Sequence, residues 1–151
     1  MTRLSRFPRL LALPVAIALA GCGAQAATPW TQSGNDVIVD PVGEGAANVR
    51  LQVVSDRIIR VTADPDGDFQ RSKSLMRVER EGAPPKFEVT EGNGSVRVAA
   101  AGISAEVSLQ DGRVAFFDAA GQPLVSEVAG GRSFEATQFD GTPYYSIRQR
   151  F

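Results

Sequence analysis

Apolar and polar residues alternate with a period of two through most of the chain after residue 36. The clearest case is the run in which Ile103, Ala105, Val107 and Leu109 share one face. Shorter runs repeat the pattern at Val49, Leu51 and Val53, at Phe87 and Val89, at Val96 and Val98, and at Tyr145 and Ile147. A period of two is typical of strands that bury one face, and no stretch of ten or more residues in this part has helical periodicity. The pattern therefore predicts about nine short antiparallel strands.

Short turn sequences that contain glycine separate these strands. They are Gly92-Asn93-Gly94, Asp111-Gly112, the stretch 120–123 and the stretch 140–143. Glycine and asparagine accept the positive φ that tight hairpins require, so we expect neighbouring strands to pair as hairpins. The expected fold class is all-β, an antiparallel β-sandwich. Its core would hold the valines, Leu51, Ile103, Leu109 and Phe116.

The first 21 residues have the layout of a secretion signal. Arg3, Arg6 and Arg9 precede an apolar run over residues 10–20, which is too short to span a bilayer. The run ends in Leu19-Ala20-Gly21-Cys22, a lipobox pattern in which a peptidase cuts before the cysteine. The interpretation is a lipoprotein-type signal peptide over 1–21, with lipidation of Cys22.

Export is expected in either of two forms. Lipid on Cys22 would anchor the protein, and the outer membrane is favoured because Gly23 rather than aspartate follows the cysteine. The alternative is ordinary cleavage after Ala26, which leaves a soluble periplasmic or secreted protein. Residues 22–35 are small and polar and are interpreted as a tether, and residues 36–151 as the folded domain.

Composition narrows the chemistry available to this chain. It has no histidine and a single cysteine, which excludes Ser-His-Asp and Cys-His catalysis, the usual zinc sites and a disulfide within the mature chain. Loss of the three signal arginines shifts the formal net charge from −1 to −4, with basic residues scattered, so no nucleic-acid partner is expected.

Two groups of residues have compositions that could suit a binding site. Asp64, Asp66 and Asp68 alternate around a proline and a glycine, which would suit calcium, but the same composition is typical of a turn. The aromatic residues Trp30, Tyr144 and Tyr145 could stack on sugar rings, yet structural roles are favoured. No motif selects a carboxylate pair for glycoside hydrolysis. We therefore assign no catalytic, cofactor or metal residue, and only Cys22 as a modification site.

Several blocks of sequence, in order, resemble the N-terminal domain of glycoside hydrolase family 31, the α-glucosidase and α-xylosidase family. They are VRLQVVSDRIIRVTADPDG at 49–67, Ser74-Leu75-Met76, the stretch 85–89, ISAEVSLQDGRVAFFDAAGQPLV at 103–125 and GTPYYSIRQRF at 141–151. The resemblance implies a mutarotase-like β-sandwich followed by a (β/α)₈ barrel. Among subgroups it is nearest to exported bacterial α-xylosidases that trim xyloglucan fragments.

The resemblance also implies that this chain alone is inactive, because the family's two catalytic aspartates belong to the barrel downstream. The last residues read as a strand ending at Phe151, which we interpret as truncation before the barrel. The expected role is a non-catalytic domain that supports the barrel, with the loop 64–74 either at the rim of the carbohydrate pocket or a plain surface excursion. Alternatives are a free-standing carbohydrate-binding lipoprotein and an envelope-assembly domain.

Overall fold

The computed structural model describes residues 28–44, 46–69 and 85–151, and all regular secondary structure in these ranges is strand. The signal segment, Cys22 and residues 70–74 of the predicted loop lie outside the described residues. The strands are β1 (Trp30–Ser33), β2 (Asp36–Val39), β3 (Asn48–Ser55), β4 (Ile58–Asp64), β5 (Phe87–Gly92), β6 (Ser95–Ala100), β7 (Ile103–Ser108), β8 (Val114–Asp118), β9 (Pro123–Ser126), β10 (Ser133–Phe139) and β11 (Thr142–Arg148). The described residues include no helix with the length and hydropathy needed to cross a membrane.

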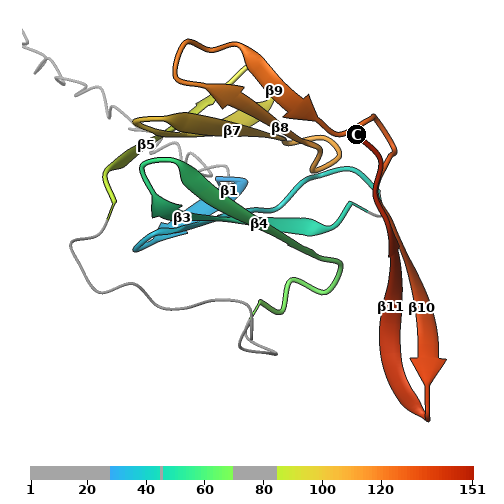
Figure 1. Ribbon diagram of the computed structural model, residues 1–151. Helices are drawn as coiled ribbons and strands as arrows, with labels where there is room; N and C mark the ends of the chain where they lie inside the picture. The colour runs from blue at the N-terminus through green and yellow to red at the C-terminus, as the bar shows by residue number, and fades with distance from the viewer. Residues whose placement is uncertain (1–27, 45, 70–84) are drawn as a thin grey trace, which may run out of the picture.

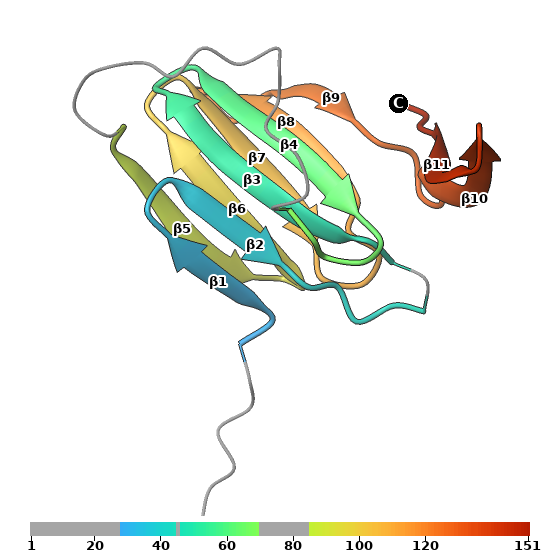
Figure 2. The ribbon, with the colours of Figure 1, turned by 90° about the horizontal axis from the view of Figure 1, so that it is seen from below.

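Two antiparallel sheets form a sandwich, and a third sheet stands apart from it (Figure 1). One layer has the order β1-β2-β3-β4 and the other β5-β6-β7-β8-β9, so within each sheet the strands pair in sequence order. Seen from below, the two layers lie face to face (Figure 2). The predicted all-β class and its hairpin connections are confirmed, with eleven strands where about nine were expected.

The core lies between the two layers and is built largely from valine. Leu51 and seven valines are fully buried. Alternation puts them there, since half-buried and buried residues alternate over the first six residues of β3. The predicted core residues Ile103, Leu109 and Phe116 are partly buried and pack against this cluster. Three other valines, Val42, Val125 and Val128, are exposed and do not belong to this core.

Two of the predicted turns are two-residue hairpin loops. Asn93 and Gly94 have φ of 52° and 73° between the paired residues Gly92 and Ser95. Asp140 and Gly141 have φ of 49° and 73° in the loop that joins β10 to β11. Positive φ at both central residues is the type I′ signature, whose twist matches that of paired strands.

The predicted tether over residues 22–35 is wrong for its last part, because Trp30–Ser33 forms β1. This strand pairs with β2 from Trp30 opposite Val39 to Ser33 opposite Asp36. The indole N–H of Trp30 donates to Glu91 Oε2 at 2.8 Å, linking the two layers at this edge. Four residues are too few to show a period of two, so the composition of the segment dominated its interpretation.

The last two strands also differ from expectation. Tyr145 and Ile147 were predicted to be half-buried in the sandwich, but every residue of β11 is exposed. β10 and β11 form their own two-stranded sheet that projects from the sandwich (Figures 1 and 2). Their alternating pattern therefore faces no second layer within the described residues.

Candidate functional site

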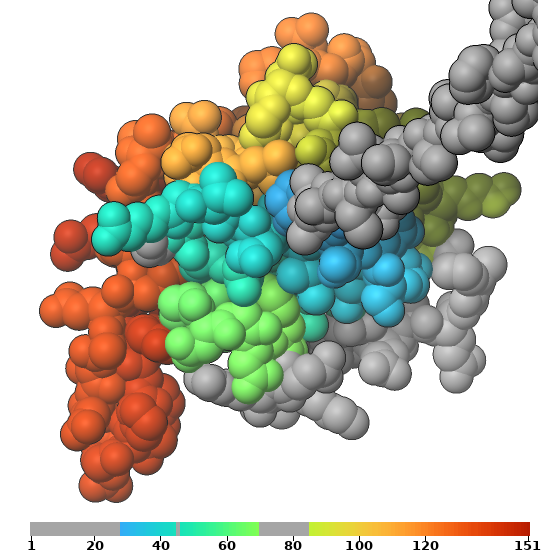
Figure 3. All heavy atoms as spheres, turned by 180° about the vertical axis from the view of Figure 1, so that it is seen from behind, coloured from blue at the N-terminus to red at the C-terminus, as the bar shows by residue number. Residues whose placement is uncertain are grey.

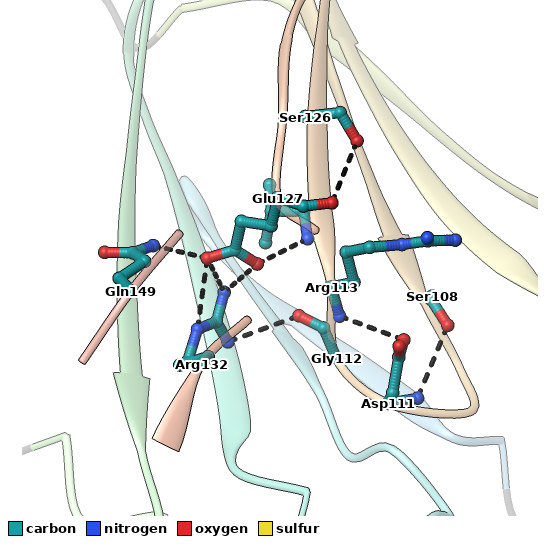
Figure 4. Close-up of polar contacts among 9 residues, drawn as sticks. Ser108, Asp111, Gly112, Arg113, Ser126, Glu127, Arg132 and Gln149 are labelled. Atoms are coloured by element: carbon teal, nitrogen blue, oxygen red, sulfur yellow. Dashed lines mark hydrogen bonds and ion pairs between the residues drawn. The ribbon is translucent and has the colours of Figure 1, made fainter. Parts of the chain in front are cut away.

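A buried polar network joins the sandwich to the β10–β11 hairpin at the end of β9. Its centre is Glu127, whose exposed fraction is 4%. The guanidinium of Arg132 donates hydrogen bonds to both carboxylate oxygens, with Nη2 at 2.6 Å from Oε1 and 2.5 Å from Oε2. Figure 4 shows Arg132 and the side-chain amide of Gln149 converging on the carboxylate, and Gln149 Nε2 donates to Oε1.

The network satisfies its charges within the protein. The backbone N–H of Val114 donates to Glu127 Oε2 at 2.8 Å, and Arg132 Nη1 donates to the Gly112 carbonyl at 3.2 Å. The side chain of Arg132 is only 11% exposed and that of Glu127 2%. A buried ion pair is tolerated when its remaining donors and acceptors are also bonded, which is the case here. Because these bonds occupy both carboxylate oxygens, Glu127 is poorly placed to act as an acid or base.

A tight turn over residues 127–131 brings Arg132 back to Glu127. Gly131 N–H donates to the Val128 carbonyl at 2.8 Å, and Gly130 has φ of 63°. A Cβ on Gly131 would lie 2.7 Å from the Val128 oxygen and 3.0 Å from the Arg150 oxygen. Only glycine therefore allows the chain to reverse this closely against the segment that follows β11.

Beside the network lies an open, polar groove of about 280 Å³ lined by Gly43, Gln110, Asp111, Arg113, Glu127 and Arg132, among others. Partial burial acts to raise the pKa of Asp111, but hydrogen bonds from Ser108 and the Arg113 amide, with the Arg113 charge, outweigh it. The pKa of Asp111 therefore lies below its usual value. Asp111 is thus an ionised carboxylate whose hydrogen bonds stay within its own turn.

The three aspartates weighed as a calcium site form a turn. Asp64 Oδ1 accepts the backbone N–H of Asp66 at 2.8 Å and that of Asp68 at 3.4 Å, and Gly67 has φ of 70°. In the part of the chain that the structure describes, no group of three His, Cys, Asp or Glu residues could hold a metal ion. The turn interpretation is the one that these contacts support.

The aromatic residues weighed for sugar stacking are not brought together. Trp30 packs against the core at β1, whereas Tyr144 and Tyr145 lie on β11, away from β1 in both ribbon views. Tyr145 stacks edge-on to Phe134, and its hydroxyl lies 3.2 Å from both oxygens of Asp66. A hollow of about 350 Å³ lies between Asp66 and hairpin residues 136–138 and 143–145.

The hairpin carries much of the exposed apolar surface of the described residues. The exposed fractions are 76% for Phe139, 53% for Tyr144 and 61% for Ile147. In the space-filling view the hairpin forms a separate orange-red lobe beside the sandwich (Figure 3). Phe139 and Tyr144 lie on one face of the hairpin and Ile147 on the other. A two-stranded hairpin alone is marginally stable in water, and exposed apolar residues on it suit contact with another body.

Sequence reasoning missed the Glu127 network altogether. Its three side chains are separated by 5 and 22 residues along the chain and come from a turn and two strand ends. No periodic pattern relates such positions. The one local signal is Gly130-Gly131, which indicates a tight turn directly before Arg132.

The comparison with known proteins points to one family. No family model matches the chain. The chain is similar to the crystal structure of the GH31 α-xylosidase from Xanthomonas citri, with 51% identity and a TM-score of 0.73 over 78% of this chain. It spans 13% of that enzyme's length. An uncharacterized protein from Listeria monocytogenes, at 18% identity and a TM-score of 0.52 over 71% of this chain and 10% of its own, shares the fold.

Proposed function

The chain belongs to glycoside hydrolase family 31, as the counterpart of the N-terminal part of an α-xylosidase, and we propose that it is the non-catalytic supporting domain of an exported enzyme of that kind. The enzyme would release α-linked xylose from oligosaccharides derived from xyloglucan. Its catalytic acid and nucleophile would lie in the barrel, and this domain would carry neither.

The observation that carries this proposal is the β10–β11 hairpin. It is fixed at its base by the Glu127 network, yet it presents Phe139, Tyr144 and Ile147 to solvent. A free-standing domain gains nothing from holding apolar side chains in water, whereas a domain that docks on a neighbour gains the free energy of burying them. The hairpin is therefore the surface through which the domain would contact the barrel.

The loop that follows β4 would lie at the edge of that contact. Asp66 from this loop meets Tyr145 of the hairpin, so both elements border the same hollow. A loop held beside the docking surface is well placed to reach the rim of a pocket in the neighbouring domain. We extend the proposal to this loop, residues 64–74, as a contributor to the sugar pocket.

A domain exchange tests the proposal. In the Xanthomonas citri α-xylosidase, the segment that matches this chain is replaced by residues 28–151, and hydrolysis of 4-nitrophenyl α-xyloside is measured. We expect the chimera to retain activity and the enzyme without the segment to lose it. A chimera that folds but has no activity, beside an active parent, would count against the proposal.

One observation favours a second role, that of a free-standing carbohydrate-binding module. Tyr144 and Tyr145 border the hollow of about 350 Å³, and exposed tyrosines can stack on sugar rings. Isothermal titration of the chain with xyloglucan oligosaccharides separates the two roles. Saturable binding that Tyr144→Ala abolishes would favour the module, and the absence of binding leaves the supporting role.

A further inference from the structure

Glu127 is a buried charge that the proposed docking function does not use directly. It lies directly after β9, 4% exposed, in a domain whose other fully buried side chains are nearly all apolar. Burying a carboxylate is unfavourable unless several partners compensate its charge. Its partners therefore show what the charge holds in place.

The partners come from the sandwich and from both legs of the hairpin. Val114, at the start of β8, belongs to the sandwich and donates its backbone N–H. Arg132 immediately precedes β10 and Gln149 immediately follows β11, so they flank the first hairpin pair, Ser133 opposite Arg148. One carboxylate thus ties both legs to the sandwich (Figure 4).

Backbone bonds continue this joint on the side of the turn. Val128 N–H donates to the Arg150 carbonyl at 3.0 Å, and Arg150 N–H donates to the Gly131 carbonyl at 3.0 Å. The segment that follows β11 is thereby held against the turn that leads into β10. The base of the hairpin is a fixed junction rather than a pair of loose connections.

A second contact lies along the hairpin, away from its base. The Tyr145 hydroxyl meets the Asp66 carboxylate of the loop after β4 at 3.2 Å. A rod that is held at its base and at one further point has a defined direction. Figures 1 and 2 show the hairpin projecting from the sandwich, and these two contacts attach it there.

We propose that Glu127 is a positioning residue whose carboxylate, through Arg132 and Gln149, sets the direction of the β10–β11 hairpin before the domain meets its neighbour. The inference rests on the proposed docking function for its purpose, but not for its structural basis. A surface that is already ordered gives up less conformational entropy on association than one that must order during it. The joint thus prepares the exposed apolar residues of the hairpin for docking.

The test is hydrogen–deuterium exchange on the full chain with Gln149→Ala. This change removes one leg of the joint and leaves the Glu127–Arg132 pair intact. We expect exchange of the amides in β10 and β11 to rise by about tenfold or more, while β6 and β7 exchange as in the wild type. The urea midpoint should stay unchanged, which a general structural role of Gln149 would not allow. The matched control is Glu106→Gln on the outer face of the sandwich, with no change in the hairpin.

Glu127→Gln is the second variant, since it keeps the size of the side chain and removes its charge. Faster exchange of the hairpin in both variants, confined to the hairpin in Gln149→Ala, supports the inference. Hairpin exchange equal to that of the wild type in Gln149→Ala would overturn it. The chimera with the Xanthomonas citri enzyme decides the docking function separately, because an inactive chimera leaves the exchange result on the isolated chain in force.

Discussion

Replacing Glu127 with alanine should be among the most destabilising single changes in the domain. The change leaves the Arg132 guanidinium, 11% exposed, without its carboxylate partner, and removes the acceptor of the Val114 amide. Removing one partner of a buried ion pair lowers the free energy of unfolding by about 3–5 kcal/mol. A single domain has about 5–15 kcal/mol in total, so about a fifth or more of the stability is at stake.

Urea unfolding followed by the fluorescence of Trp30, the single tryptophan, measures this effect. With a slope of about 1–3 kcal/mol per M, the midpoint should fall by about 1 M or more. Glu106→Ala is the matched control, because its pair with Arg97 is 31% and 37% exposed and should contribute only about 0.2–1 kcal/mol.

A double variant tests the cause of the effect. Glu127→Ala with Arg132→Met removes the uncompensated charge, so it should be more stable than Glu127→Ala alone. The reasoning is refuted if Glu127→Ala shifts the midpoint no more than Glu106→Ala does. It is also refuted if the double variant loses more free energy of unfolding than the two single variants lose together.

Three further predictions concern other parts of the chain. In thermal unfolding, Gly43→Ala should lower the stability by about 1–3 kcal/mol, because a Cβ at this position would overlap the Gln110 carbonyl oxygen. The control Gly92→Ala should have a much smaller effect, since a Cβ at Gly92 would have no atom within 4 Å. The pKa of Asp111 is lowered in the fold, so its charge stabilises the folded state at pH values above the unfolded pKa of about 3.9. The melting temperatures of the wild type and of Asp111→Asn should therefore converge as the pH falls through the folded pKa. Cys22→Ala should abolish labelling by a fatty-acid analogue and release the protein from membranes, and equal labelling of both forms would favour cleavage after Ala26.

Much of the fold could be predicted from the sequence, because local chemistry and the final structure agree in most places. The residues from Ile103 to Leu109 alternate cleanly, and all but the last form β7 in the middle of its sheet, where one face meets the core. Asn93-Gly94 and Asp140-Gly141 are turn sequences that need positive φ, and both have it. In these segments a few neighbouring residues contain the whole signal.

The failures have a different origin. β1 is a four-residue strand whose single apolar anchor, Trp30, finds its partner Glu91 in the other sheet. Glu127 is stabilised by Arg132 and Gln149 across a turn and a hairpin, and a carboxylate in sequence gives no sign that it will be buried. Contacts of this kind depend on the completed tertiary structure, so no window of sequence contains them.

The hairpin differs from both cases, because its strands were predicted and only its surroundings were not. A period of two specifies that one face of a strand is apolar, but not what covers that face. Along β11, Tyr145 and Ile147 carry the same alternation as the core strands, and yet they are 39% and 61% exposed. A solvent-facing strand has no physical reason to keep such a pattern, and exposed edges of this kind invite aggregation. The alternation in β11 is therefore itself an argument that this face is buried when the domain performs its function.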